Sequence, residues 1–195
     1  MQFTASPGVD GQPGRSPRQE SLNLLVGNRF RADDDRVFTW IAGLPAHPLL
    51  VHLSVVDAPV GTILLLLWAT VPRWRDRLGV VTVGVNAVAF AASLLAKSTG
   101  EALLPAMGLS EHAPGQVGPH AQYADLLVVA VGLCLGISVL LYAAQRWLTT
   151  DRFPRRKTLL LTLRVLAVLA AVFALVMVAL TGHAGAQLVW GNFPN

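Results

Sequence analysis

The chain has 195 residues, of which 53% are hydrophobic and 13% charged, and its formal net charge at pH 7 is +4. A mean hydropathy of +0.53 is too high for an ordinary soluble domain and is typical of a protein that spans a membrane. The positive charge does not indicate nucleic-acid binding, because the basic residues stand in short runs at the ends of apolar stretches.

The N-terminal segment 1–46 differs in composition from the rest. Residues 1–20 are rich in Gly, Pro, Ser and Arg and cannot bury enough apolar surface to become ordered, so we expect a flexible tail. No apolar core precedes a small-residue cleavage site, which argues against a signal peptide. Residues 36–44 mix aromatic, aliphatic and charged side chains and predict a short helix lying on the membrane interface.

The remainder contains apolar runs long enough to cross a bilayer, which takes about 20 helical residues. Backbone polar groups in lipid must be satisfied within the segment, so these runs must be helices. The sequence therefore predicts an all-α polytopic membrane protein, a four-helix bundle over residues 47–191 with a C-terminal tail at 192–195. Pro59 is expected to kink the first span. The two halves of the chain show no clear self-similarity. The predicted spans are 49–71, 78–96, 124–145 and 158–181.

Arginine and lysine counts predict the orientation. The loops between spans one and two and between spans three and four carry most of the basic residues, whereas the long middle loop has only Lys97 at its edge. The positive-inside rule then places both Arg-rich loops in the cytoplasm and both termini outside. The basic residues of the two loops are Arg73, Arg75, Arg77, Arg146, Arg152, Arg155, Arg156 and Lys157.

In this topology the five histidines fall on the outer side, and they collect near the bilayer edge. Histidines from different helices suit b-type haem ligation, zinc or copper binding, or proton handling. The structural alternative is that they cap helix ends and bind loop carbonyls, with no cofactor at all. His47 and His52 are about 140° apart around the helix, so they do not form a pair on one face. The histidines are His47, His52, His112, His120 and His183.

Three histidines stand out by their surroundings. His52 is favoured over His47 because it points into the bundle or the lipid, and His120 opens the third span. His183 follows the fourth span between Gly182 and Gly185, which would allow a macrocycle or a neighbouring helix to approach closely. The same glycines could instead cap the end of that helix.

Three motifs in order carry a resemblance to a known family. HPLLVH opens the first span, HAQYAD opens the third, and TGHAGAQLV follows the fourth. Together they resemble a bacterial four-span membrane family catalogued as domain-of-unknown-function family 2231, over about residues 43–191. The domain is fused in some bacteria to Rieske iron–sulfur or cytochrome c domains, which implies a redox setting on the outer face. Leu53-Ser54 and Ala186 depart from that pattern, and we expect any redox partner to be a separate protein.

Polar residues inside the spans are the remaining candidates. Asp57 and Asn86 lie at similar depths, and we expect a hydrogen bond between them, with a proton-carrying role for Asp57 as the functional alternative. Lys97 and Glu101 are four residues apart and predict a surface ion pair. Cys134, the only cysteine, rules out a covalent c-type haem and predicts a packing residue.

No enzyme signature is present, such as a P-loop, a G-x-S-x-G elbow or H-E-x-x-H. The favoured hypothesis is a bundle that binds b-type haem near its outer face and exchanges electrons with an extracytoplasmic redox protein. Its candidate ligands are His52, His120 and His183, with His47 as an alternative or supporting residue. The rivals are a non-catalytic accessory or scaffold subunit of a membrane complex, and a metal- or proton-handling protein that uses zinc, copper or Asp57. The sequence leaves homo-oligomerisation open.

Overall fold

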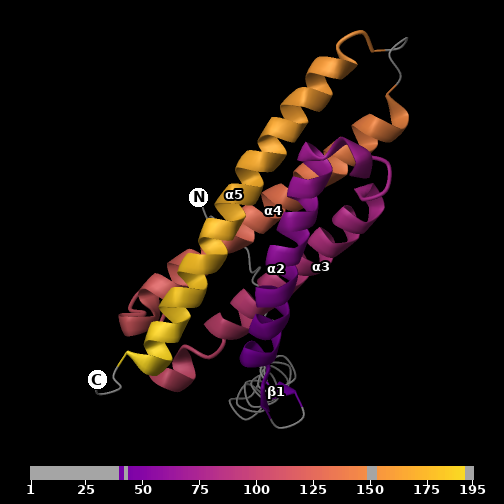
Figure 1. The fold of residues 1–195 in the computed structure, drawn as a ribbon. Helices are drawn as coiled ribbons and strands as arrows, with labels where there is room; N and C mark the ends of the chain where they lie inside the picture. The colour runs from indigo at the N-terminus through magenta and orange to yellow at the C-terminus, as the bar shows by residue number, and fades with distance from the viewer. Residues whose placement is uncertain (1–39, 42–43, 149–152, 192–195) are drawn as a thin grey trace, which may run out of the picture. The chain divides into compact units, whose positions relative to one another are not determined.

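The computed structural model describes residues 40–41, 44–148 and 153–191. Its long elements are the helices α2 (Ala46–Thr70), α3 (Gly79–Glu101), α4 (Gly118–Trp147) and α5 (Arg156–Trp190), which lie side by side (Figure 1). Short 3₁₀ turns stand between them at Pro72–Trp74 (η1), Pro105–Met107 (η2) and Gly115–Val117 (η3). All four helices are long and apolar enough to cross a membrane, which confirms the all-α four-helix prediction.

Two helices extend well beyond the predicted spans. α4 begins at Gly118, before the apolar run, and α5 continues to Trp190. The predicted bounds were set by hydropathy, whereas the bounds of a helix are set by its backbone hydrogen bonds, which continue beyond the apolar run. One consequence is that Gly182 and Gly185 lie inside α5, so the reading of these glycines as a helix cap was wrong. The residue that caps α5 is Gly191.

The predicted interfacial helix at 36–44 is not found in the described part of that segment. Trp40–Ile41 (β1) instead pairs in antiparallel fashion with Leu44–Pro45 (β2). Residues 36–39 and 42–43, the rest of the predicted N-terminal tail and the predicted C-terminal tail lie outside the described residues. Pro59 lies within α2, which remains one helix on both sides of it.

The helices form two hairpins, α2–α3 and α4–α5. Each helix packs extensively against its hairpin partner and against one helix of the other hairpin, α2 on α5 and α3 on α4. α2 and α4 touch only slightly across the bundle. Small side chains fill the centre, where Ala89, Ala130, Ala167 and Ala174 are fully buried, because small residues let helices approach closely in a membrane.

The two hairpins repeat one packing pattern. When α2 is shifted along the sequence by the interval between His47 and His120, most of its buried positions fall on buried positions of α4, such as Ala58 on Val131 and Trp68 on Leu141. Shifting α3 along the sequence by another constant interval places the buried Ala89 of α3 on the buried Ala174 of α5. The sequence showed no self-similarity, because equivalent positions share burial but not residue type.

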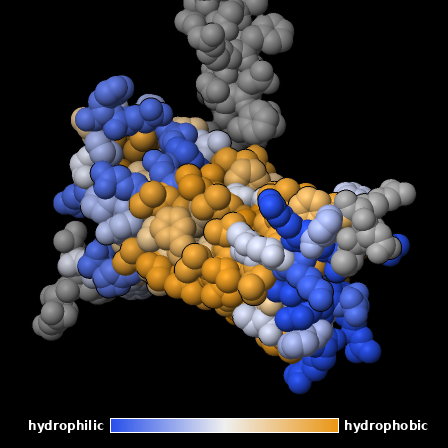
Figure 2. Space-filling view, turned by 90° about the horizontal axis from the view of Figure 1, so that it is seen from above, coloured by the Kyte–Doolittle hydropathy of each residue, from blue (hydrophilic) through white to orange (hydrophobic). Residues whose placement is uncertain are grey.

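The outward faces of the helices are apolar. Figure 2 shows hydrophobic side chains over the middle of the visible face and hydrophilic ones towards its two ends. This pattern is the reverse of a soluble bundle, and it fits contact with lipid. The most exposed of these apolar residues within the helices include Val56, Val80, Leu161 and Leu169.

The hairpin topology separates two kinds of residue. The described arginines of the η1 loop and of the α4–α5 connection lie at one end of the bundle, which we call the arginine end (Figure 1). The starts of α2 and α4 and the ends of α3 and α5 lie at the other, which we call the histidine end because His47, His120 and His183 lie there. Which end faces the cytoplasm stays a prediction.

Candidate functional site

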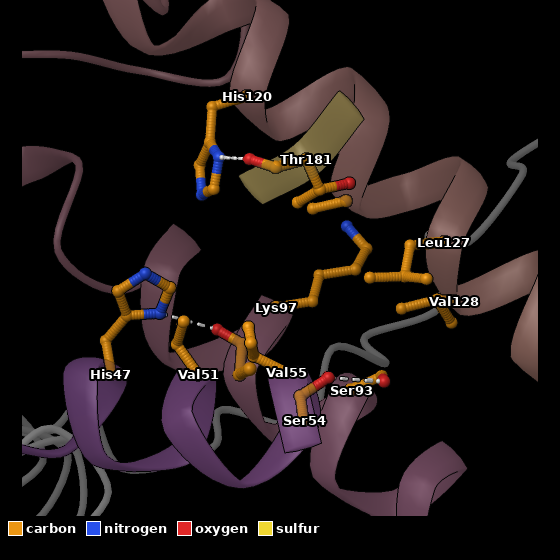
Figure 3. A pocket seen from close by; sticks show the side chains of 12 residues that line it. His47, Val51, Ser54, Val55, Ser93, Lys97, His120, Leu127, Val128 and Thr181 are labelled. Carbon is orange, nitrogen blue, oxygen red and sulfur yellow. Dashed lines mark hydrogen bonds between the residues drawn. The ribbon is translucent and has the colours of Figure 1, made fainter. Parts of the chain in front are cut away.

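A small cavity at the histidine end brings all four helices together. It holds about 60 Å³ and is mostly apolar, with the imidazoles of His47 and His120 and the side chain of Lys97 on its wall (Figure 3). The remaining lining residues are Val51, Ser54, Val55, Ser93, Ala96, Ala124, Leu127, Val128 and Thr181.

His47 lies in the first turn of α2 and binds the neighbouring helix of its hairpin. Its Nδ1 lies 2.8 Å from the carbonyl oxygen of Ala96 on α3. Gly100, one turn further along α3, leaves room for the ring, because a Cβ there would come within 2.9 Å of His47 Cε1. The histidine therefore needs both the carbonyl and the glycine of α3.

His120 repeats this arrangement in the other hairpin. It lies in the first turn of α4, and its Nδ1 is 3.0 Å from the carbonyl oxygen of Thr181 on α5. Gly185 lies one turn beyond Thr181, and a Cβ there would be 3.2 Å from the His120 ring. Each hairpin thus carries a histidine, a carbonyl and a glycine at equivalent positions, which we call the histidine clasp.

The clasp fixes which ring nitrogen carries the proton. A backbone carbonyl can only accept a hydrogen bond, so Nδ1 of both His47 and His120 must be the donor. In the neutral imidazole the other nitrogen, Nε2, then has a free electron pair. Both rings direct this nitrogen towards the space between them (Figure 3). The cavity is therefore a place where two electron-pair donors from different hairpins face the same small volume.

Charged residues lie beside the histidine pair. Lys97 of α3 forms the predicted ion pair with Glu101 and a second one with Asp125 of α4, whose carboxylate oxygen is 2.8 Å from the ammonium. The two carboxylates offset the lysine charge next to the cavity. The second pair was missed because the sequence does not say which helices are neighbours.

The structure does not bring His52, His120 and His183 together. His52 is exposed, and its Nδ1 lies 2.5 Å from the carbonyl oxygen of Pro48 in its own helix. His183 is exposed on α5, and His112 is exposed in the middle loop. The expected convergence is replaced by the pair His47 and His120. His47 and His52 lie on different sides of α2, as an angle of about 140° around the helix requires. However, His47 is the residue that faces the bundle.

Asp57 and Asn86 do not form the predicted hydrogen bond. The Asn86 amide donates instead to the carbonyl oxygens of Gly61, at 3.0 Å, and of Thr82, at 2.9 Å. Asn86 is buried because Gly61 of α2 leaves space for its side chain. One oxygen of Asp57 is buried without a hydrogen-bond partner among the described residues. The role of Asp57 as a proton carrier stays a prediction.

The histidine pair suits a metal as a donor set, but the cavity limits the size of the ligand. Two imidazoles are all the protein ligands that b-type haem requires, whereas structural zinc requires four. However, pockets for drug-sized ligands hold about 300–1,000 Å³, so the cavity of about 60 Å³ is much smaller than a porphyrin-sized pocket. Among the described residues, no group of three or more His, Cys, Asp or Glu could hold a metal ion. The hydroxyl of Thr181, which is buried and has no hydrogen-bond partner in the described part of the chain, is a further possible oxygen ligand on the cavity wall.

Comparison with known proteins places the chain in one family. A family model described as "Predicted membrane protein (DUF2231)" matches residues 43–192. The chain belongs to this family. The match covers the whole helical bundle and agrees with the resemblance drawn from the three motifs. No curated protein and no solved structure matches the chain.

Proposed function

We propose that this integral membrane protein binds a single transition-metal ion, copper or zinc, at the histidine end of the bundle. Nε2 of His47 and Nε2 of His120 are the ligands in this proposal, with the Thr181 hydroxyl and water available for the remaining positions. Imidazole is a preferred ligand of both metals. Two protein nitrogens leave open positions, so the ion would be exchangeable rather than structural.

The observation that carries the proposal is the fixed tautomer of both rings. Ligating histidines nearly always donate their other ring N–H to a carbonyl, a carboxylate or water, which orients the ring and makes the free nitrogen a better donor. His47 and His120 both have this support, from Ala96 and Thr181. The small size of the cavity favours a bare ion over the b-type haem expected from the sequence. Haem, electron transfer and an extracytoplasmic redox partner remain predictions.

The test must separate a ligand from a residue that only joins helices. Asparagine places an amide N–H near the position of Nδ1 but has no counterpart of Nε2. His47→Asn and His120→Asn should therefore keep much of the bond to the neighbouring helix and lose the metal. Loss of the group that hydrogen-bonds a metal ligand weakens metal binding about 10–100-fold. We expect each of these variants, which loses the ligand itself, to weaken metal binding by more than that. His52→Asn and His183→Asn, which change histidines outside the cavity, are the matched controls.

The measurement is titration of the purified, chelator-treated protein in detergent with copper(I), copper(II) and zinc, followed by metal analysis. One ion per chain, lost in both cavity variants and retained in both controls, supports the proposal. Equal binding by all variants overturns it, as does no binding by the wild type. A Soret band in protein purified from haem-replete cells, if it is lost on substitution of His47 and His120, would mean that the site binds haem and not a bare ion.

The accessory-subunit alternative also has an observation in its favour. Each clasp joins the two helices of a hairpin, so His47 and His120 could serve the fold alone. In that case His47→Asn and His120→Asn would alter only stability, and the wild type would take up no metal. The same titration therefore decides between the two.

A further inference from the structure

The arginine end of the bundle contains a second cavity of different chemistry. It lies where the η1 loop and the start of α3 meet the end of α4, and it holds about 320 Å³. Its wall is mainly polar and carries three guanidinium groups against one carboxylate. The lining residues are Arg75, Asp76, Arg77, Gly79, Val80, Tyr142, Gln145 and Arg146.

Two hydrogen-bond donors of this cavity have no acceptor within the part of the chain that the structure describes. Nε of Arg75 and Nε2 of Gln145 are buried without a hydrogen-bond partner among the described residues. The ion pairs found in the described part of the chain involve only Lys97, so Asp76 is not ion-paired with any of these arginines. A buried donor without an acceptor is costly, and most such groups in proteins are satisfied by a partner, water or a ligand.

The start of α3 adds to the attraction for an anion. Gly79 and Val80, the first two residues of the helix, line the cavity, and none of the described side chains caps this helix end. Backbone N–H groups and the helix dipole make a helix N-terminus favourable for phosphate. Gly79 also allows Tyr142 to pack on the helix start, because a Cβ there would lie 2.8 Å from Tyr142 Cδ2.

We infer that this cavity binds a phosphate group, supplied by the headgroup of an anionic phospholipid or by free phosphate. Arginine forks match phosphate oxygens, and the buried donors of Arg75 and Gln145 gain the acceptors they lack. The volume is in the range of small-ligand pockets. The cavity lies at one end of the apolar helices, which is the level of the lipid headgroups when such helices span a bilayer. Basic pockets between membrane helices bind such headgroups.

The experiment compares three probes on the full-length protein in a neutral detergent. Thermal unfolding is followed with added phosphatidylglycerol, with phosphatidylcholine and with inorganic phosphate. A rise in midpoint with phosphatidylglycerol alone identifies the lipid headgroup as the source. A rise with inorganic phosphate at similar concentration identifies free phosphate. No rise with either anion, or an equal rise with phosphatidylcholine, overturns the inference.

Variants then locate the site. Arg146→Gln should weaken anion binding about fivefold, the effect of one basic residue near an anionic surface. Gln145→Leu should also weaken it, and since this change removes a buried donor without a partner, the protein without anion should keep its stability. Arg73→Gln is the matched control, because Arg73 lies in the same loop but stacks on Trp74 outside the cavity. An equal loss in Arg73→Gln would mean that net charge, not this cavity, binds the anion.

Discussion

The two hairpins share a packing pattern and a histidine clasp, yet their interiors differ in polarity. The α2–α3 hairpin buries Asn86, Thr82 and Ser54, whereas the equivalent positions of α4–α5 are Ala171, Ala167 and Leu127. Ser54 and Ser93 share a hydrogen bond of 2.8 Å across the first hairpin. The second hairpin is held mainly by packing of small and aliphatic side chains.

The polar interior of the first hairpin carries a cost in stability. Buried oxygens of Asp57, Thr82 and Asn86 have no hydrogen-bond partner among the described residues, and unsatisfied polar groups in a membrane interior are costly. The second hairpin also contains such groups, at Gln145, Arg164 and Thr181. Such groups persist more often where they serve a function. The second hairpin supplies a mainly apolar wall against which the first can hold polar groups. Exchanges between equivalent positions can test this division.

The largest effect is expected where the polar hairpin packs most tightly. Gly61→Ala places a Cβ 3.0 Å from Oδ1 of Asn86, which is fully buried and cannot move aside. We expect a loss of roughly 1–3 kcal/mol in the free energy of unfolding, measured by SDS titration in mixed micelles. Gly84→Ala, whose Cβ meets nothing within 4 Å, is the control and should be neutral or slightly stabilising.

A double variant sharpens this result. If Asn86 is the obstacle, Gly61→Ala combined with Asn86→Ala should be less destabilising than the sum of the two single changes. Simple additivity would show that the strain at Gly61 has another source.

A loss of stability of intermediate size is expected in one histidine clasp and not in the other. Gly100→Ala brings a Cβ to 2.9 Å from the His47 ring, whereas Gly185→Ala leaves 3.2 Å to the ring of His120. We expect the first change to cost about 1 kcal/mol through the lost inter-helix bond, and the second to be near neutral. Gly182→Ala, in open space, should gain stability through helix propensity. Equal effects at Gly100 and Gly182 in the same SDS titration would argue against a clasp in the first hairpin.

The smallest effect concerns the ion pair that joins the hairpins. Asp125→Asn removes one of the two carboxylates bound to Lys97, and its side chain is 57% exposed. Exposed pairs contribute about 0.2–1 kcal/mol and are screened by salt. The destabilisation should therefore be small and should disappear in high salt, as followed by thermal unfolding in detergent. A large, salt-independent loss would mean that Asp125 has a role beyond this pair.

The sequence predicted the site residues only in part. His120 was nominated and lies in the cavity, and Lys97 was paired correctly with Glu101. His52 was preferred to His47 because the motif alone does not say which side of α2 faces the other helices. Gly100 was overlooked altogether, although a glycine one turn after a small residue near a helix end was the available signal.

The number and apolar character of the helices were determined by the sequence alone, whereas the full lengths of α4 and α5 were not. A span must be helical in lipid and must be about 20 residues long, so composition and run length leave little choice. Helix neighbours, the pairing of His47 with His120 and the repeat of the two hairpins depended on the tertiary structure. Outside and inside faces of a membrane helix are both apolar, so hydrophobic periodicity does not reveal which residues meet. Only the packed bundle decides which of five histidines share a cavity.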